Sequence, residues 1–158
     1  MAYANKGTNI CLNEKAVFGP YKTALAGINS NGGMEHVMIK DGAFNGPSVV
    51  DYIYKLRQTN KGIKIAVFLD NLSSHKTKDV MEAFEQHGIT PIFNATYCPD
   101  FNPIETVFAQ VKLRYKADRL NMLANDEDVD EAVLIRKAFK SVRNETILKC
   151  ISRSLKLL

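Results

Sequence analysis

The chain has 158 residues, of which 46% are hydrophobic and 24% are charged, and this composition predicts one soluble domain with one compact core. No apolar run approaches the roughly 20 residues of a membrane-spanning helix, and the N-terminus lacks the apolar stretch of a signal peptide. We therefore expect an intracellular protein, in the nucleus or the cytoplasm, without membrane insertion. The widely spaced cysteines Cys11, Cys98 and Cys150 predict buried free thiols and exclude a disulfide framework or a paired zinc motif.

The first predicted unit is a β-hairpin followed by a helix. Residues 15–29 are rich in strand-forming side chains, residues 30–33 form a glycine-containing turn, and residues 35–40 form a second strand. After a break at residues 45–48, apolar side chains recur at helical spacing until about Asn60.

A parallel strand–helix–strand crossover is predicted next. Residues 63–69 are almost continuously apolar, which is typical of a strand covered on both faces. Residues 71–74 supply capping side chains for a helix with Val80, Met81 and Phe84 as its apolar stripe. Residues 89–97 form the second strand.

The last third of the chain is predicted to be helical. A loop at residues 98–103 leads into a helix whose apolar positions share one face. The acidic residues 126–131 then separate it from a basic C-terminal helix, so we divide the chain into a core (1–120) and an extension (121–158).

The net charge of +4 gathers in the extension. Residues 132–158 hold seven basic side chains against one acid, a balance of +6, which leaves −2 for the remainder. Two interpretations stand: contact with a nucleic-acid backbone, or a solvated helix face, which is the commoner role of such a helix. The candidate contacts are Arg136, Lys137, Lys140 and Arg143.

Asp70 and Glu105 are the candidate catalytic residues. Asp70 ends a predicted buried strand and Glu105 opens the helix after the neighbouring strand, so both carboxylates should reach one end of the sheet. Carboxylates are the ligands that Mg²⁺ or Mn²⁺ prefers, and such ions serve phosphodiester chemistry.

Each candidate also has a structural explanation. Asp70 can satisfy backbone donors in its own loop. Glu105 occupies the acid position of a capping box that begins at Asn102, with Pro103 as the first helical residue. His75 can contact a phosphate, or it can form a local hydrogen bond near a helix start.

Two phrases resemble those of DDE transposases of the mariner and related bacterial insertion-sequence superfamily. They are FLDNLSSHK at residues 68–76 and YCPDFNPIE at residues 97–105, the latter followed by Phe108 and Lys112. The 34 residues between Asp70 and Glu105 match the glutamate-bearing branch. Residues 3–7, YANKG, resemble the family's upstream aromatic-x-x-Lys-Gly segment, so the resemblance covers nearly the whole chain.

The resemblance implies a ribonuclease-H-like α/β fold with a mixed sheet and metal-dependent DNA strand cleavage and transfer. Asp70 and Glu105 are then metal ligands, with Asn71, His75 and Lys112 supporting the site or contacting phosphate. In the family, however, the first catalytic aspartate lies on a strand before the YANKG-like segment, and no residue of this sequence fills that role.

From this departure we expect the isolated chain to be inactive on DNA. The alternative is a domesticated transposase remnant that serves as a non-catalytic structural or nucleic-acid-binding subunit. A fragment of a longer reading frame, or one of two split pieces, explains the sequence equally well. We also expect the slot of the missing strand, between the hairpin and the Asp70 strand, to be filled by another polypeptide, an upstream segment or residues 8–12.

Overall fold

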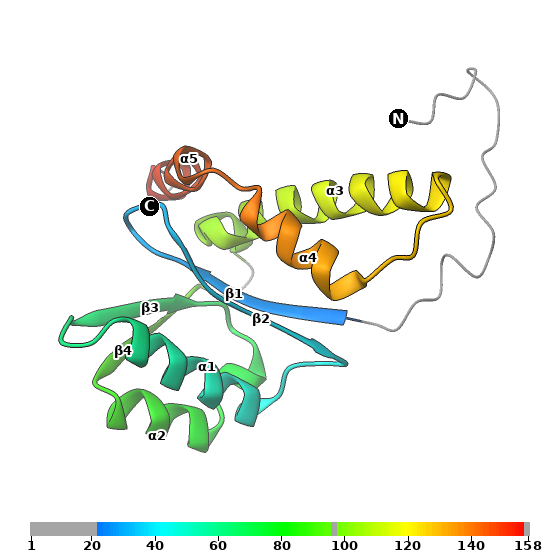
Figure 1. The fold of residues 1–158 in the computed structure, drawn as a ribbon. Coiled ribbons are helices and arrows are strands. Elements are labelled where there is room, and N and C mark those ends of the chain that lie inside the picture. Colours follow the sequence, from blue (N-terminus) through cyan, green and yellow to red (C-terminus); the bar gives the residue numbers. More distant parts are fainter. Residues whose placement is uncertain (1–21, 96–97, 157–158) are drawn as a thin grey trace.

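The computed structural model describes residues 22–95 and 98–156, and its elements alternate between strands and helices before ending in three helices (Figure 1). In chain order the elements are β1 (Lys22–Ile28), β2 (Met34–Asp41), α1 (Gly46–Thr59), β3 (Ile65–Leu69), α2 (Lys78–Gln86), β4 (Ile89–Phe93), α3 (Pro103–Ala124), α4 (Glu131–Lys140) and α5 (Asn144–Leu155). Among the described residues, no helix is long and apolar enough to cross a membrane.

The predicted hairpin is confirmed by the antiparallel pairing of β1 and β2, with Leu25 opposite Met38. Its turn is held by the Asn29 side chain, which accepts from the amides of Asn31 (3.0 Å) and Gly33 (2.8 Å). Gly32 takes a φ of +81°, a conformation that favours glycine. The predicted first strand began at residue 15; residues 15–21 lie outside the described part of the chain.

The predicted parallel crossover is also confirmed, because β3 and β4 pair in parallel with Phe68 opposite Ile92. The expectation that β3 is covered on both faces is wrong. Val67 and Leu69 face the core of α1 and α2, whereas Phe68 on the other face is 39% exposed. Among the described elements, helices cover this two-stranded sheet on one side only, and alternation of side chains along the strand turns every second residue to the other side.

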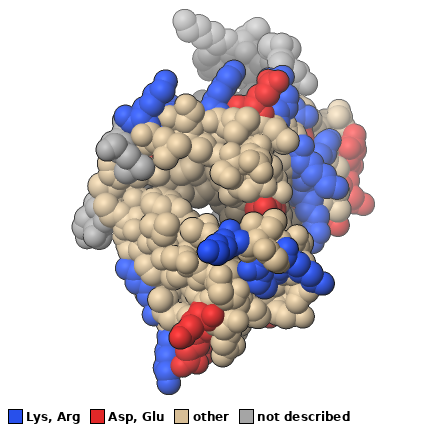
Figure 2. Space-filling model, turned by 90° about the vertical axis from the view of Figure 1, so that its left-hand side faces the viewer, with Lys and Arg blue, Asp and Glu red and all other residues tan. Residues whose placement is uncertain are grey.

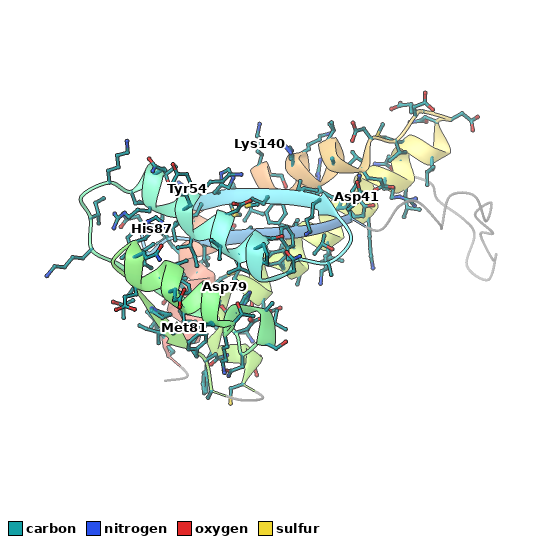
Figure 3. The ribbon with its side chains drawn as sticks, turned by 90° about the horizontal axis from the view of Figure 1, so that it is seen from below. Asp41, Tyr54, Asp79, Met81, His87 and Lys140 are labelled. Carbon is teal, nitrogen blue, oxygen red and sulfur yellow. The ribbon has the colours of Figure 1, made fainter. Side chains whose placement is uncertain are left out.

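The helix after β3 begins later than predicted. Ser73–His75 form a separate short 3₁₀ turn. α2 starts at Lys78, with Thr77 at its N-cap position. Met81, which we predict to be in the apolar stripe, is 40% exposed. Ala83 is buried in its place. Figure 3 shows Met81 and Asp79 on α2, with Tyr54 of α1 and His87 after α2 nearby. The rings of Tyr54 and His87 meet edge to face at 5.8 Å.

The described chain has two hydrophobic cores instead of the single core expected. The first joins α1, α2 and the covered face of β3–β4, and its buried members are Val49, Ile53, Leu56, Val80, Ala83, Phe84 and Ile89. The second joins α3, α4, α5 and one face of the hairpin, and its buried members are Val107, Val111, Ala138, Phe139, Ile147 and Cys150. The other face of the hairpin contacts α1, where the centres of the Tyr52 and His36 rings lie 6.2 Å apart.

The basic C-terminal segment is two helices, which corrects the prediction of one. α4 ends at Lys140 and α5 begins at Asn144, and the Ser141 hydroxyl donates to the Ala138 carbonyl at the break (2.7 Å). The predicted acidic linker is shorter than expected, because Glu131 is already the first residue of α4. The Asp130 carboxylate caps that helix by accepting from the amides of Ala132 and Val133.

The strands of the described chain form two separate two-stranded sheets, β1–β2 and β3–β4. Within the described residues, β1 and β3 therefore each have one edge without a strand partner. The molecule is hollowed near the middle of the face that Figure 2 presents.

Candidate active site

Asp70 follows β3 directly and lies at the edge of the sheet where the parallel strands β3 and β4 both end. One carboxylate oxygen lies 2.7 Å from Nδ1 of His75, which is 8% exposed, although the pair lacks hydrogen-bond geometry. The same oxygen accepts a long contact from the Leu72 amide (3.4 Å). The carboxylate itself is 37% exposed, so it remains open to a ligand.

Asparagine side chains fasten the loop after β3 to the loop after β4. The Asn71 side-chain amide donates to the Asn94 carbonyl, and the Asn94 amide donates to the Cys98 carbonyl at 2.7 Å. Lys76 donates to the Asn71 oxygen at 2.5 Å and lies 5.0 Å from the centre of the Phe93 ring. Both asparagine amides are thus used in holding the backbone around the candidate site.

Glu105 lies in the first turn of α3, with an exposed side chain. Its backbone amide donates to the Asn102 carbonyl (3.1 Å), as expected at a helix start. The capping-box explanation is not realised, because the Asn102 side chain makes no capping hydrogen bond. Within the described residues the Glu105 carboxylate also has no hydrogen-bond partner, and it therefore stays available.

These side chains border one pocket of about 230 Å³. Its lining residues are Asp70, Asn71, Asn94, Ala95, Cys98, Asn102 and Glu105. The fold thus brings two acids that are separated by 34 residues to one place, as the strand-end argument expected. Their roles as catalytic residues and metal ligands stay predictions.

The donor atoms of this pocket suit a hard divalent cation, because two carboxylates and several amide groups are oxygen ligands. In the described part of the chain, no three His, Cys, Asp or Glu side chains converge closely enough to hold a metal ion together. The pocket therefore offers two acidic ligands, and any further ligand must be of another kind or come from elsewhere.

The other predicted site residues lie outside the pocket. Lys112 is exposed on α3, and the four basic candidates of the extension are exposed on α4 and before α5. Lys137 lies 3.7 Å from the Asp118 carboxylate, which partly offsets its charge. On the face shown in Figure 2, basic side chains lie at several separate places, including beside the central hollow, and are not gathered in one patch.

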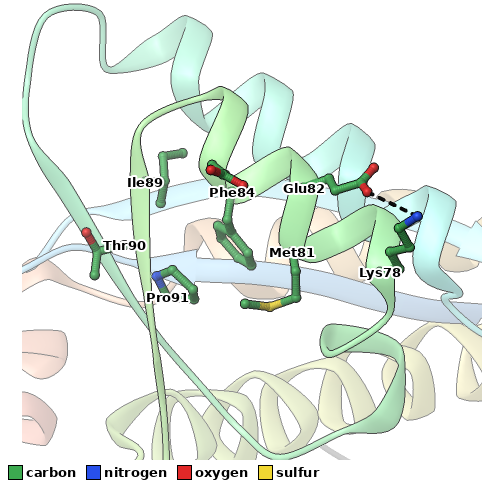
Figure 4. A pocket seen from close by; sticks show the side chains of 8 residues that line it. Lys78, Met81, Glu82, Phe84, Ile89, Thr90 and Pro91 are labelled. Atoms are coloured by element: carbon green, nitrogen blue, oxygen red, sulfur yellow. Dashed lines mark ion pairs between the residues drawn. The ribbon is translucent and has the colours of Figure 1, made fainter.

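A larger hollow of about 400 Å³ lies between α2 and β4 (Figure 4). Met81, Phe84 and Pro91 line it, and an exposed ion pair between Lys78 and Glu82 (3.6 Å) lies at its rim. Its lining is mainly apolar and it does not contain Asp70 or Glu105, so it offers no comparable chemistry.

Four residues of the pocket were not predicted as site residues from the sequence: Asn94, Ala95, Cys98 and Asn102. Cys98 was expected to be a buried thiol but is partly exposed, whereas Cys150 is buried as expected; both are free, and Cys11 lies outside the described residues. Asn102 was considered only as a helix cap. Its place in the loop beyond a parallel strand was the available signal, because such loops line the ligand crevice of α/β sheets.

A family model described as "DDE superfamily endonuclease" matches residues 1–128. No curated protein matches the sequence significantly. Among solved structures, the catalytic domain of Mos1 transposase with raltegravir and manganese is similar, with a TM-score of 0.59 and 16% identity over 87% of this chain and 76% of that chain.

Two DNA complexes are similar as well. The Mos1 transposase paired-end complex with the left transposon end has a TM-score of 0.66 and 17% identity, covering 99% of this chain and 47% of that chain. The Mos1 mariner paired-end complex with manganese has a TM-score of 0.64 and 18% identity, covering 98% and 47%. The chain thus spans about half the length of the Mos1 chains in these complexes. At these identities the likeness concerns the fold, and the predicted ribonuclease-H-like α/β class is confirmed.

Proposed function

The chain belongs to the DDE superfamily endonucleases, and on that premise we propose that it provides two of the carboxylates of a transposase-type, metal-dependent site for DNA strand cleavage and transfer. The observation that supports this most is the shared pocket of Asp70 and Glu105. One acid comes from a strand end and the other from a helix start, so the sheet and α3 together determine their separation.

In this proposal Asp70 and Glu105 hold Mg²⁺ or Mn²⁺. When bound, such an ion lowers the pKa of a coordinated water and stabilises charge on a phosphodiester oxygen. The chain's own residues orient the ligands. His75, almost buried beside Asp70, limits the positions open to that carboxylate. Asn71 and Asn94 fix the two loops from which the pocket is built.

We further propose that phosphate groups of DNA contact exposed basic side chains. Lys112 lies two helical turns beyond Glu105 on α3, and the extension contributes Arg136, Lys137, Lys140 and Arg143. Contacts of this kind depend on salt, because each one releases counterions from the DNA. Alanine at all four positions of the extension should remove up to about four phosphate contacts. The slope of log K for DNA binding against log salt concentration should then become shallower by about one for each lost contact. A charge-matched control replaces the exposed Lys55, Lys61, Lys64 and Lys78.

A further strand is proposed to complete the sheet beside β3. Within the described residues β3 pairs with β4 alone and β1 pairs with β2 alone, so backbone groups along one edge of each lack a strand partner. Each buried unpaired group would cost about 1–3 kcal/mol. Another polypeptide or an upstream segment would satisfy them by strand addition and could bring a third acid. The third candidate, residues 8–12, lies outside the described residues.

A second candidate function is a non-catalytic subunit derived from a transposase. It is favoured by the finding that only two acids line the pocket of the described chain. The two candidates differ in what the completing strand supplies: a third carboxylate in the enzyme, and only backbone hydrogen bonds in the subunit.

Nicking of supercoiled plasmid DNA in Mg²⁺ or Mn²⁺ tests this proposal. The isolated chain is expected to give no nicking above buffer, since one acidic ligand is missing. Nicking that disappears in Asp70→Ala would contradict the proposed inactivity and show that another residue completes the site. Nicking that persists in both Asp70→Ala and Glu105→Ala would instead come from a contaminating nuclease or another site, and would remove the support for this pocket.

A further inference from the structure

Asn102 is a buried polar residue whose side chain has no use in the fold. It is 6% exposed, yet its side chain forms no hydrogen bond with any described residue. It occupies the N-cap position of α3, where an asparagine oxygen ordinarily accepts from a backbone amide of the first turn. Here that bond is not made.

The contrast with the neighbouring asparagines is direct. Asn71 and Asn94 line the same pocket, and both donate their side-chain amides to backbone carbonyls. Asn102 lines the pocket without any such bond. Folding therefore explains two of these three amides and leaves the third without a role.

The polar end of Asn102 remains accessible from the pocket. Among the described residues, the fully enclosed side-chain atoms without a hydrogen bond are the Tyr52 hydroxyl and His75 Nδ1, and the Asn102 amide is not one of them. The small exposure of Asn102 thus includes its amide group, at the pocket wall. A ligand that enters the pocket can therefore reach this amide, which no bond of the fold occupies.

The chemistry of the pocket selects the ligand. Its charged groups are the carboxylates of Asp70 and Glu105, which attract a cation. Asn102 and Glu105 lie on one helical turn, because the Glu105 amide donates to the Asn102 carbonyl at 3.1 Å. An asparagine oxygen is an ordinary ligand for hard divalent cations.

We infer that Asn102 supplies a third protein oxygen, through Oδ1, to the divalent cation held by Asp70 and Glu105. This inference rests on the proposed function, since it requires that the two acids bind a metal ion. It assigns a binding role to a residue that the sequence suggested only as a helix cap. A carboxylate from a completing strand would then be a further ligand.

Nuclear magnetic resonance of the ¹⁵N-labelled 158-residue chain, titrated with MgCl₂, tests the inference. The side-chain NH₂ pair of Asn102 is identified by its loss in Asn102→Asp. It is expected to shift with the same midpoint as the backbone amides of Asp70 and Glu105. If those backbone amides shift and the Asn102 pair stays in place, the inference is overturned and the metal site stands. If none of these signals moves, both proposals fail.

Substitutions separate a ligand from a structural residue. Asn102→Leu is expected to weaken Mg²⁺ binding at least about tenfold without lowering Tm, because no hydrogen bond of the fold is lost. Asn102→Asp should tighten binding, since it adds negative charge at the same place. The control Asn121→Ala, an exposed position on the same helix, should change neither quantity. A lower Tm with unchanged Mg²⁺ affinity in Asn102→Leu would overturn the assignment.

Discussion

The two halves of this molecule are packed differently. In the half made of α1, α2, β3 and β4, helices cover one face of the sheet and the other face exposes Phe68 and Ile92. In the half made of β1, β2, α3, α4 and α5, three helices enclose a core against the hairpin. Within the described residues, the first half therefore leaves one face of its sheet exposed, whereas in the second half three helices pack on one face of the hairpin.

The candidate active site lies where these halves meet. Asp70 comes from the first half and Glu105 from the second, and Asn71–Asn94 and Ser154–Asp100 contacts hold the surrounding loops. Neither half alone contains both acids. The spacing of the acids therefore depends on how the halves are held together, and the strand that we propose between the sheets would influence the site directly.

Substitution of one phenylalanine in each half, Phe139 and Phe68, tests the difference in packing most strongly. Phe139 is 2% exposed and meets Phe108 edge to face at 5.4 Å. We expect Phe139→Ala to lower the free energy of unfolding by about 3–5 kcal/mol. Phe68→Ala, on the bare sheet face, should cost about 1 kcal/mol or less. Urea unfolding followed by circular dichroism measures both, and equal costs would mean that the β3–β4 face is covered in solution.

A tyrosine of the second half, Tyr115 on α3, makes the stability of the fold depend on pH. Burial and a hydrogen bond to Glu131 raise the pKa of Tyr115 from 10.0 to about 12. The fold therefore favours the neutral phenol, and this contribution to stability is complete below about pH 10 and is lost as pH rises from about 10 to 12. Burial also raises the pKa of Tyr52, so a residual loss remains in any Tyr115 variant.

Tyr115→Phe should accordingly show a smaller fall in the free energy of unfolding between about pH 10 and 12 than the parent chain. Urea unfolding across this range is the measurement. Parallel curves for parent and variant would show that neither burial nor the Glu131 contact raises the pKa of Tyr115 in solution.

Two helix N-caps give a matched comparison of smaller size. The Asp130 carboxylate accepts from the amides of Ala132 (2.9 Å) and Val133 (3.1 Å). Asp130→Ala should therefore cost about 1 kcal/mol of unfolding free energy. Asn102→Ala at the equivalent position of α3 should cost close to nothing, since no capping bond exists there. An equal loss at the two caps would show that Asn102 does stabilise the helix start.

The smallest effect is expected for the ion pair of Lys78 and Glu82 on α2 (Figure 4), whose side chains are 87% and 52% exposed. Glu82→Gln should lower the free energy of unfolding by no more than about 0.5 kcal/mol, and less in high salt. A loss above about 1 kcal/mol that persists in high salt would indicate that the rim of the α2–β4 hollow contributes to the core.

Local patterns sufficed for the elements whose residues interact with near neighbours. The turn at Asn29–Gly33 and the helical spacing of Val49 to Leu56 predicted the hairpin and α1. The apolar run before Asp70 predicted β3 but not its bare face, because the same residues occur in strands covered on one or both sides. Whether a cover exists depends on elements that a local pattern does not contain.

For the site, sequence reasoning found the residues whose positions follow from strand ends and helix starts, Asp70 and Glu105. It did not predict that the Asn102 side chain makes no capping hydrogen bond. The sequence of a helix start is the same whether or not the N-cap side chain forms that bond. Sequence reasoning also joined α4 and α5 into one helix, since the break at Ser141–Arg143 contains neither proline nor glycine. Tertiary packing decides both features.

The most direct test of the account is a double-mutant cycle of Mn²⁺ binding. Calorimetric titration compares the parent chain, Asp70→Asn, Glu105→Gln and the double variant. If one ion joins the two acids, each single substitution should weaken binding at least about tenfold, and the double variant should be little worse than either single one. Mn²⁺ affinity that is unchanged in both single variants, or losses that simply add, would contradict a shared site.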